Sequence, residues 1–187
     1  MMALAIGERR NLDVLTKQRY LNHFKKVPDQ IEKMLADTKD CQKVAKHLAK
    51  HDHVFFLGRY YQLPIAHEGS LKFKEITYIH AESYPAGELK HGPLALISQQ
   101  HPTVLIDPED ALVEKTRSAR EEIEARKGKV YCISDARSAD INIPSTMDIL
   151  YPFLTVIPCQ LLAYYAAKEL NREIDKPRNL AKSVTVE

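Results

Sequence analysis

The chain has only three cysteines, Cys41, Cys132 and Cys159, among its 187 residues. The odd number and the wide spacing exclude a disulfide framework and the closely spaced cysteine pairs of a structural zinc site. We therefore expect reduced thiols in a cytoplasmic protein. The sequence also lacks internal repeats and low-complexity segments, which excludes solenoid and fibrous classes.

The sequence also has no large excess of positive or negative charge. The 27 basic and 25 acidic residues give a net charge of +2, and the basic residues form no cluster of the kind that binds nucleic acid. The longest apolar runs fall well short of the roughly 20 residues that span a bilayer. Residues 1–7 are apolar, but they are too short for a signal peptide and carry no basic leader. We expect neither a nucleic-acid nor a membrane partner.

What the sequence does contain suits a soluble globular domain, since 44% of its residues are hydrophobic and 28% are charged. Helical spacing of apolar residues predicts helices through the first fifty residues. Three later apolar runs read as buried strands: His53–Leu57, Thr103–Ile106 and Lys129–Ile133. Shorter strands are expected at Ala81–Tyr84 and at Asp148–Tyr151.

Helices are predicted between these strands, at about Pro64–Ile79, at Asp110–Lys127 with Gly128 as its cap, and at Leu154–Leu170. Strands that alternate with helices indicate βαβ units, a parallel sheet and helices on both of its faces. The fold class is therefore α/β, and ligands in such folds bind at the carboxyl ends of the strands. The turn Gly58–Gln62 lies at that edge, but with one glycine it is better interpreted as a structural turn than as a phosphate site.

The candidate chemistry begins on the helix after the first strand, where Glu68, Lys72, Glu75 and Ile79 are spaced to share one face. One interpretation is a row of surface ion pairs, each contributing a few tenths of a kcal/mol. The other is a general base, Glu75, beside a lysine that keeps its carboxylate charged. The spacing alone does not choose between them.

Two more residues are candidates. His91 follows a polar loop and precedes Gly92 and Pro93, a position suited to proton transfer near neutral pH. Lys182 lies in an irregular polar tail near the end of the chain. It is either an ordinary exposed lysine or an amine that forms a Schiff base with a carbonyl substrate.

Five segments together resemble a known family. They are FLGR at Phe56–Arg59, EGSLKFKEITYIHAE at Glu68–Glu82, GELKHGPLALI at Gly87–Ile97, IPCQLLAYYAA at Ile157–Ala167 and DKPRNLAKSVTVE at Asp175–Glu187. They resemble, in order, the C-terminal part of glutamine–fructose-6-phosphate aminotransferase (isomerizing), also called glucosamine-6-phosphate synthase. The resemblance runs from about Val27 to the last residue and is looser over the first twenty.

The resemblance implies a fold. The family's isomerase part has two sugar isomerase (SIS) domains, and this chain is similar to the second one with its C-terminal tail. We therefore expect an SIS-type three-layer sandwich with a five-stranded parallel sheet. The expected division is an N-terminal helical segment at 1–50, the SIS domain at 51–170 and a catalytic tail at 171–187.

The resemblance also implies roles for the candidate residues. Glu75 would be the base that moves a proton between C1 and C2 of the sugar, with Lys72 beside it. His91 would open the sugar ring in a neighbouring subunit's site, which implies a homodimer. Lys182 would form the imine with fructose 6-phosphate, and the main chain at Ala181 would lie against the sugar. No cofactor or metal is implied.

The implied reaction makes glucosamine 6-phosphate from fructose 6-phosphate and ammonia derived from glutamine, within amino sugar biosynthesis and the UDP-N-acetylglucosamine pathway. The sequence departs from the family in lacking the glutaminase domain and the first SIS domain, which supplies most phosphate contacts. We expect it to be incomplete alone. Two alternatives are a non-catalytic SIS module that binds sugar phosphates and a structural dimerisation module.

Overall fold

The computed structural model describes residues 2–180, and its centre is a parallel sheet of five strands. The strands are β1 (His53–Gly58), β2 (His80–Pro85), β3 (Thr103–Ile106), β4 (Val130–Ser134) and β5 (Ile141–Asn142). Their order is β2-β1-β3-β4-β5, and every neighbouring pair is parallel. The predicted α/β fold with a five-stranded parallel sheet is confirmed.

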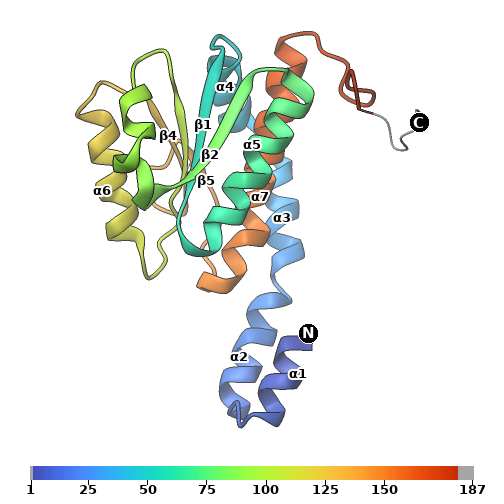
Figure 1. Cartoon of the computed structure of the whole chain (residues 1–187). Coiled ribbons are helices and arrows are strands. Elements are labelled where there is room, and N and C mark those ends of the chain that lie inside the picture. Colours follow the sequence, from blue (N-terminus) through green and yellow to red (C-terminus); the bar gives the residue numbers. More distant parts are fainter. Residues whose placement is uncertain (1, 181–187) are drawn as a thin grey trace, which may run out of the picture.

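Helices cover both faces of this sheet (Figure 1). One face packs against α4 (Lys39–Leu48), α5 (Leu63–Thr77) and α7 (Tyr151–Glu169). The other face packs against α6 (Val113–Glu124) and the 3₁₀ helix η2 (Ala86–His91), which is followed by η3 (Pro93–Leu96). Successive side chains of β1 point to opposite faces of the sheet, so β1 contributes to two hydrophobic cores. Phe56 belongs to the core under α4, α5 and α7, whereas Phe55 and Leu57 belong to the core under α6 and η2. The molecule is the expected three-layer sandwich.

The helices before residue 50 differ in how they pack. The first two, α1 (Met2–Arg9) and α2 (Val14–Phe24), bury no side chain and project from the body in Figure 1. The next two, α3 (Val27–Ala36) and α4, supply Val27, Cys41, Val44 and Leu48 to the core beneath the sheet. The predicted boundary at residue 50 stays a prediction, and α3 and α4 belong physically to the sandwich.

Two local predictions are wrong. Residues Asp148–Tyr151 are not a strand: Asp148–Leu150 form the 3₁₀ helix η4, which runs directly into α7. Pro152, in the first turn of α7, explains why, since proline fits the start of a helix and lacks the N–H that a strand needs. The fifth strand is instead Ile141–Asn142. The end of α6 is also shifted, because the left-handed residue there is Lys127, with φ 63°, and not Gly128.

The segment Asp148–Glu169 is long and apolar enough to cross a bilayer by length and composition alone, and half of its most apolar stretch is buried. The core helix of a soluble protein has the same features. Here α7 packs along α4 and α5, and Leu154, Leu162 and Ala166 are fully buried. The apolar character of α7 is therefore explained by its place in the core.

All three cysteines are unpaired and buried. Burial raises the pKa of the Cys41 and Cys132 thiols to about 12 and also raises the pKa of Cys159. These thiols are held in their neutral form, which is the poor nucleophile. They serve as small apolar side chains of the core.

Candidate functional site

Helix α5 brings Lys72 and Glu75 together. The Lys72 ammonium donates a hydrogen bond of 2.6 Å from Nζ to Oε2 of Glu75, and the two side chains are 39% and 28% exposed. This bond is the main cause that raises the pKa of Lys72, against a smaller opposing effect of burial. The lysine is therefore a fixed cation beside the carboxylate. The spacing prediction holds for these two residues, whereas Ile79 lies beyond the end of the helix.

The pair lines an open groove of about 890 Å³. One wall is α5, with Lys72, Glu75 and Ile76, and the other is the segment that follows α7. That segment contributes Ile174, Asp175, Lys176, Pro177 and Leu180. The volume is in the range of small-molecule sites. Ala181 and Lys182 lie outside the described residues, so their roles stay predictions, but the groove wall is the stretch of chain that leads to them.

The histidine lies elsewhere. His91 ends η2, on the face of the sheet opposite to α5, where Leu89 is buried against Phe55 and Leu57. Its side chain is 74% exposed, and its Nε2 is 3.8 Å from Oε2 of Glu88. It does not line the groove at Lys72 and Glu75. Within one chain, the structure joins two of the predicted site residues and leaves His91 apart from them.

The carboxyl edge of the sheet holds a residue that the sequence did not reveal. Asp107 directly follows β3 and is 5% exposed, and burial raises its pKa to about 7. Its Oδ1 atom is buried without a hydrogen-bond partner. A buried carboxyl of this kind is a frequent functional-site signal, but a lone Asp after an apolar run carries no such mark in the sequence.

The turn after β1 is built for close packing. A Cβ atom at Gly58 would lie 2.2 Å from the backbone oxygen of Gln62, so only glycine fits there. The following Tyr60 adopts φ 55° and packs against Tyr61, with the ring planes tilted by 46° and the centroids 4.0 Å apart. These features agree with the structural interpretation of the turn.

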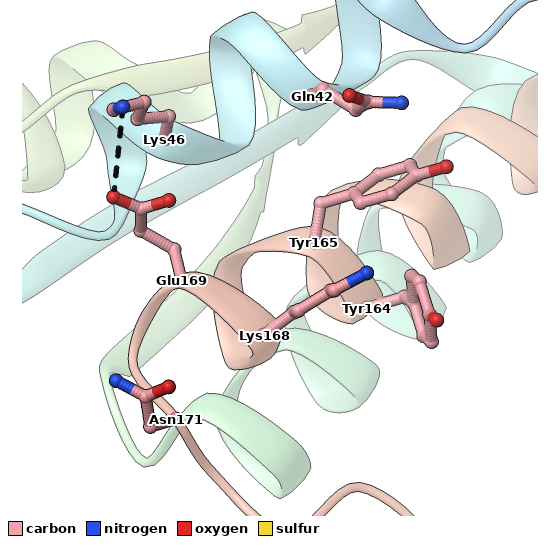
Figure 2. A pocket seen from close by; sticks show the side chains of 7 residues that line it. All are labelled: Gln42, Lys46, Tyr164, Tyr165, Lys168, Glu169 and Asn171. Carbon is pink, nitrogen blue, oxygen red and sulfur yellow. Dashed lines mark ion pairs between the residues drawn. The ribbon is translucent and has the colours of Figure 1, made fainter.

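A second groove, of about 680 Å³, lies between α4 and α7 (Figure 2). Figure 2 shows Lys46 of α4 reaching toward Glu169 of α7, with 4.0 Å between Nζ and Oε1. Tyr164, Tyr165 and Lys168 precede Glu169 on α7 and also line the groove. Of the predicted site residues, none of those that the structure describes lines this groove, and the groove offers no base paired with a lysine as closely as Glu75 is. Among residues 2–180, no group of three metal-ligating side chains could hold a metal ion.

Sequence comparison with known proteins identifies a domain family and a set of similar enzymes. The SIS domain family matches residues 47–170. Glutamine–fructose-6-phosphate aminotransferase (isomerizing) from Aquifex aeolicus is 46% identical over 91% of this chain and 30% of its own length. The enzyme of the same name from Escherichia coli K12 is 42% identical over the whole chain and 32% of its own length.

The fold comparison agrees. The C-terminal domain of glucosamine-fructose-6-phosphate aminotransferase from Francisella tularensis superposes with a TM-score of 0.87 at 33% identity. The match covers 94% of this chain and 52% of that one. Tagatose-6-phosphate ketose/aldose isomerase from Escherichia coli shares the fold, with a TM-score of 0.73 at 18% identity. The chain spans 30 to 32% of the length of the sequence relatives described above.

Proposed function

The chain belongs to the SIS domain family, and from this membership we propose that it acts as the C-terminal sugar isomerase domain of a glutamine–fructose-6-phosphate aminotransferase. The reaction would convert fructose 6-phosphate and ammonia derived from glutamine into glucosamine 6-phosphate. One observation carries the proposal. The Lys72–Glu75 pair lies on one wall of a groove whose other wall is the segment leading to Lys182.

Each residue has a chemical task in this proposal. His91 transfers the proton that opens the sugar ring. The Lys182 amine then attacks the C2 carbonyl, and the adduct loses water to form an imine. Ammonia then displaces the lysine. The carboxylate of Glu75 takes a proton from C1 and returns it to C2, which turns the ketose imine into an amino aldose. The Lys72 ammonium holds Glu75 in place through their hydrogen bond.

The surroundings of the domain follow from the same proposal. By the family resemblance, His91 would serve the site of a neighbouring subunit in a homodimer, which agrees with the placement of His91 on η2 and of Glu75 on α5, across the sheet. A first SIS domain would complete the phosphate site, and a glutaminase domain would supply ammonia. We place the protein in the cytoplasm and in amino sugar biosynthesis, with the chain divided into 1–50, 51–170 and the tail 171–187. We propose no nucleic-acid or membrane partner.

Borohydride trapping tests the imine. The chain is incubated with fructose 6-phosphate, reduced, digested and mapped by mass spectrometry. We expect a sugar adduct on Lys182 and none in Lys182→Arg, which keeps the charge but cannot form a stable imine. An adduct spread over exposed lysines such as Lys176, or no adduct on Lys182 in the complete enzyme, contradicts the proposal. No adduct on the folded chain alone means that the first SIS domain is needed for binding. Sugar-phosphate binding without any adduct supports the non-catalytic SIS module instead.

A second experiment tests the role of Glu75 as the general base. In D₂O, the complete enzyme is expected to exchange deuterium into C1 of the bound sugar, because the proton that Glu75 takes from C1 can exchange with solvent before Glu75 returns it. Glu75→Gln keeps the shape and loses the base, so the Lys182 adduct should remain while exchange falls by at least roughly 10²-fold. Equal exchange in both proteins would remove Glu75 from the mechanism.

A further inference from the structure

Tyr78 contacts the C-terminal segment at three points. It follows the last residue of α5 and lies three positions after Glu75, with the left-handed φ of 66°. The Arg178 guanidinium carbon lies 4.2 Å from the centre of its ring, and that of Arg172 lies 5.2 Å away. The backbone N–H of Arg178 also donates a hydrogen bond of 3.0 Å to the Tyr78 hydroxyl.

These contacts bracket the wall of the groove. Four of the five residues that line it opposite Lys72 and Glu75 lie between the two arginines in the sequence, namely Ile174, Asp175, Lys176 and Pro177; the fifth, Leu180, lies two residues beyond Arg178. Of these three contacts, only the hydrogen bond needs the phenol oxygen, since the arginines bind to the face of the ring. One side chain at the end of α5 therefore contacts both ends of the stretch 172–178, which forms most of the opposite wall.

We propose that Tyr78 is a positioning residue that anchors the C-terminal segment so that Lys182 is presented to a carbonyl substrate beside Lys72 and Glu75. This inference rests on the proposed function and deepens it. Lys182 is four residues beyond Arg178, and four extended residues reach at most ~14 Å. A chain fixed at Arg178 keeps the amine within a small volume, whereas a chain released at Arg172 lets it sample a far larger one. Confinement of this kind raises the rate of an intramolecular encounter.

The test uses this chain and a set of matched variants. Tyr78→Phe keeps the ring and removes the hydroxyl acceptor. Tyr78→Asn removes the ring and suits the left-handed backbone, so the helix end is preserved. Tyr164→Ala, on the groove of Figure 2, removes a half-exposed tyrosine that makes no cation–π contact or side-chain hydrogen bond with either arginine within the described residues, and serves as the control. Arg178→Gln removes the closer cation, and Arg178→Lys is the conservative rescue.

The first readout is hydrogen exchange without sugar. In Tyr78→Phe we expect the Arg178 amide alone to exchange about tenfold faster, because it loses its acceptor. In Tyr78→Asn we expect faster exchange over the whole of residues 172–180, with the strands unchanged. Unchanged exchange of residues 172–180 in Tyr78→Asn overturns the anchor.

The second readout is the rate of Lys182 trapping against fructose 6-phosphate concentration. Tyr78→Asn and Arg178→Gln should lower the saturating rate roughly tenfold with a smaller change in half-saturating concentration, and Arg178→Lys should recover part of the rate. Faster exchange with an unchanged trapping rate makes the anchor merely structural and overturns the positioning role. No adduct on Lys182 in the parent protein, tested with the first SIS domain present, overturns the proposed function itself, and the positioning role with it.

Discussion

At the scale of single residues, the burial of Asp107 makes the stability of the folded chain depend on pH. Its pKa of about 7 in the folded chain lies above the ordinary 3.8, chiefly because of burial, with Arg117 and Arg120 opposing the rise and Glu109 and Asp110 adding to it. Between these values the folded chain binds a proton that the unfolded chain has released. Its contribution to stability is therefore full below pH 4 and is lost as the pH rises through 7.

We expect Asp107→Asn to flatten this dependence. At pH 8 the variant should be more stable than the parent by as much as ~4 kcal/mol, because the folded parent must ionise a buried carboxyl; near pH 4 the two should converge. Urea unfolding at pH 5 and pH 8 measures the difference. Asp52→Asn, at an exposed position, is the control. Equal pH slopes for parent and Asp107→Asn would contradict the assignment.

Single residues also show which parts of the candidate site can be predicted from the sequence. Lys72 and Glu75 were predicted as a pair because their contact depends only on helical spacing, which is local. Asp107 and Tyr78 were missed because burial depends on the packing of α6 over β3, and the Tyr78 contact joins residues 100 positions apart. No local pattern encodes either contact.

At the scale of elements, the end of α6 shows why glycine can mislead. The N–H of Gly128 bonds to the oxygen of Ile123 and that of Lys127 to Glu124, the pattern of a Schellman motif. Lys127 takes the left-handed position. Gly128 is needed for space instead, since a Cβ there would lie 2.5 Å from Ile123 and 2.6 Å from Ile97.

Substitutions at the two positions should have opposite effects. Lys127→Gly should stabilise the chain by about 1 kcal/mol, because a left-handed lysine is strained. Gly128→Ala should destabilise it by ~1–3 kcal/mol through overpacking. Thermal unfolding measures both, with Lys115→Gly, inside the same helix, as the control that must destabilise. A loss of stability in Lys127→Gly would contradict this account.

Strands were predictable from the sequence where they are buried on both faces. The apolar runs at β1, β3 and β4 stand out for that reason. Strand β5 has only two residues, too few for any pattern, and the apolar residues before Pro152 belong to the start of a helix. Short elements at the rim of a sheet are set by their neighbours and not by their own residues.

At the scale of the whole molecule, the proposed role of His91 in a neighbouring subunit's site predicts a dimer. Light scattering should give about twice the chain mass of 21.4 kDa. In the complete enzyme, mixing Glu75→Gln with His91→Asn subunits should restore part of the activity that each variant lacks alone, since one mixed site keeps both residues. A monomer at high concentration, or no restoration in mixed dimers, would contradict the arrangement.

The parallel sheet with helices on both faces followed from the alternation of strands and helices, and the family from its motifs. The packing of α3 and α4 under the sheet and the return of the tail to α5 did not follow, because both are long-range contacts between segments with ordinary compositions. Topology was thus predictable, and the construction of the groove was not.

Because all three thiols are buried, their reaction with a labelling reagent measures how often the structure around each of them opens. Cys41 and Cys159 share the core under α7, and Cys132 lies in the core on the other side of the sheet. An alkylating reagent can reach each sulfur only during the moments when that layer opens. The labelling rates of these cysteines therefore report how often the core on each face of the sheet opens locally, without any added probe.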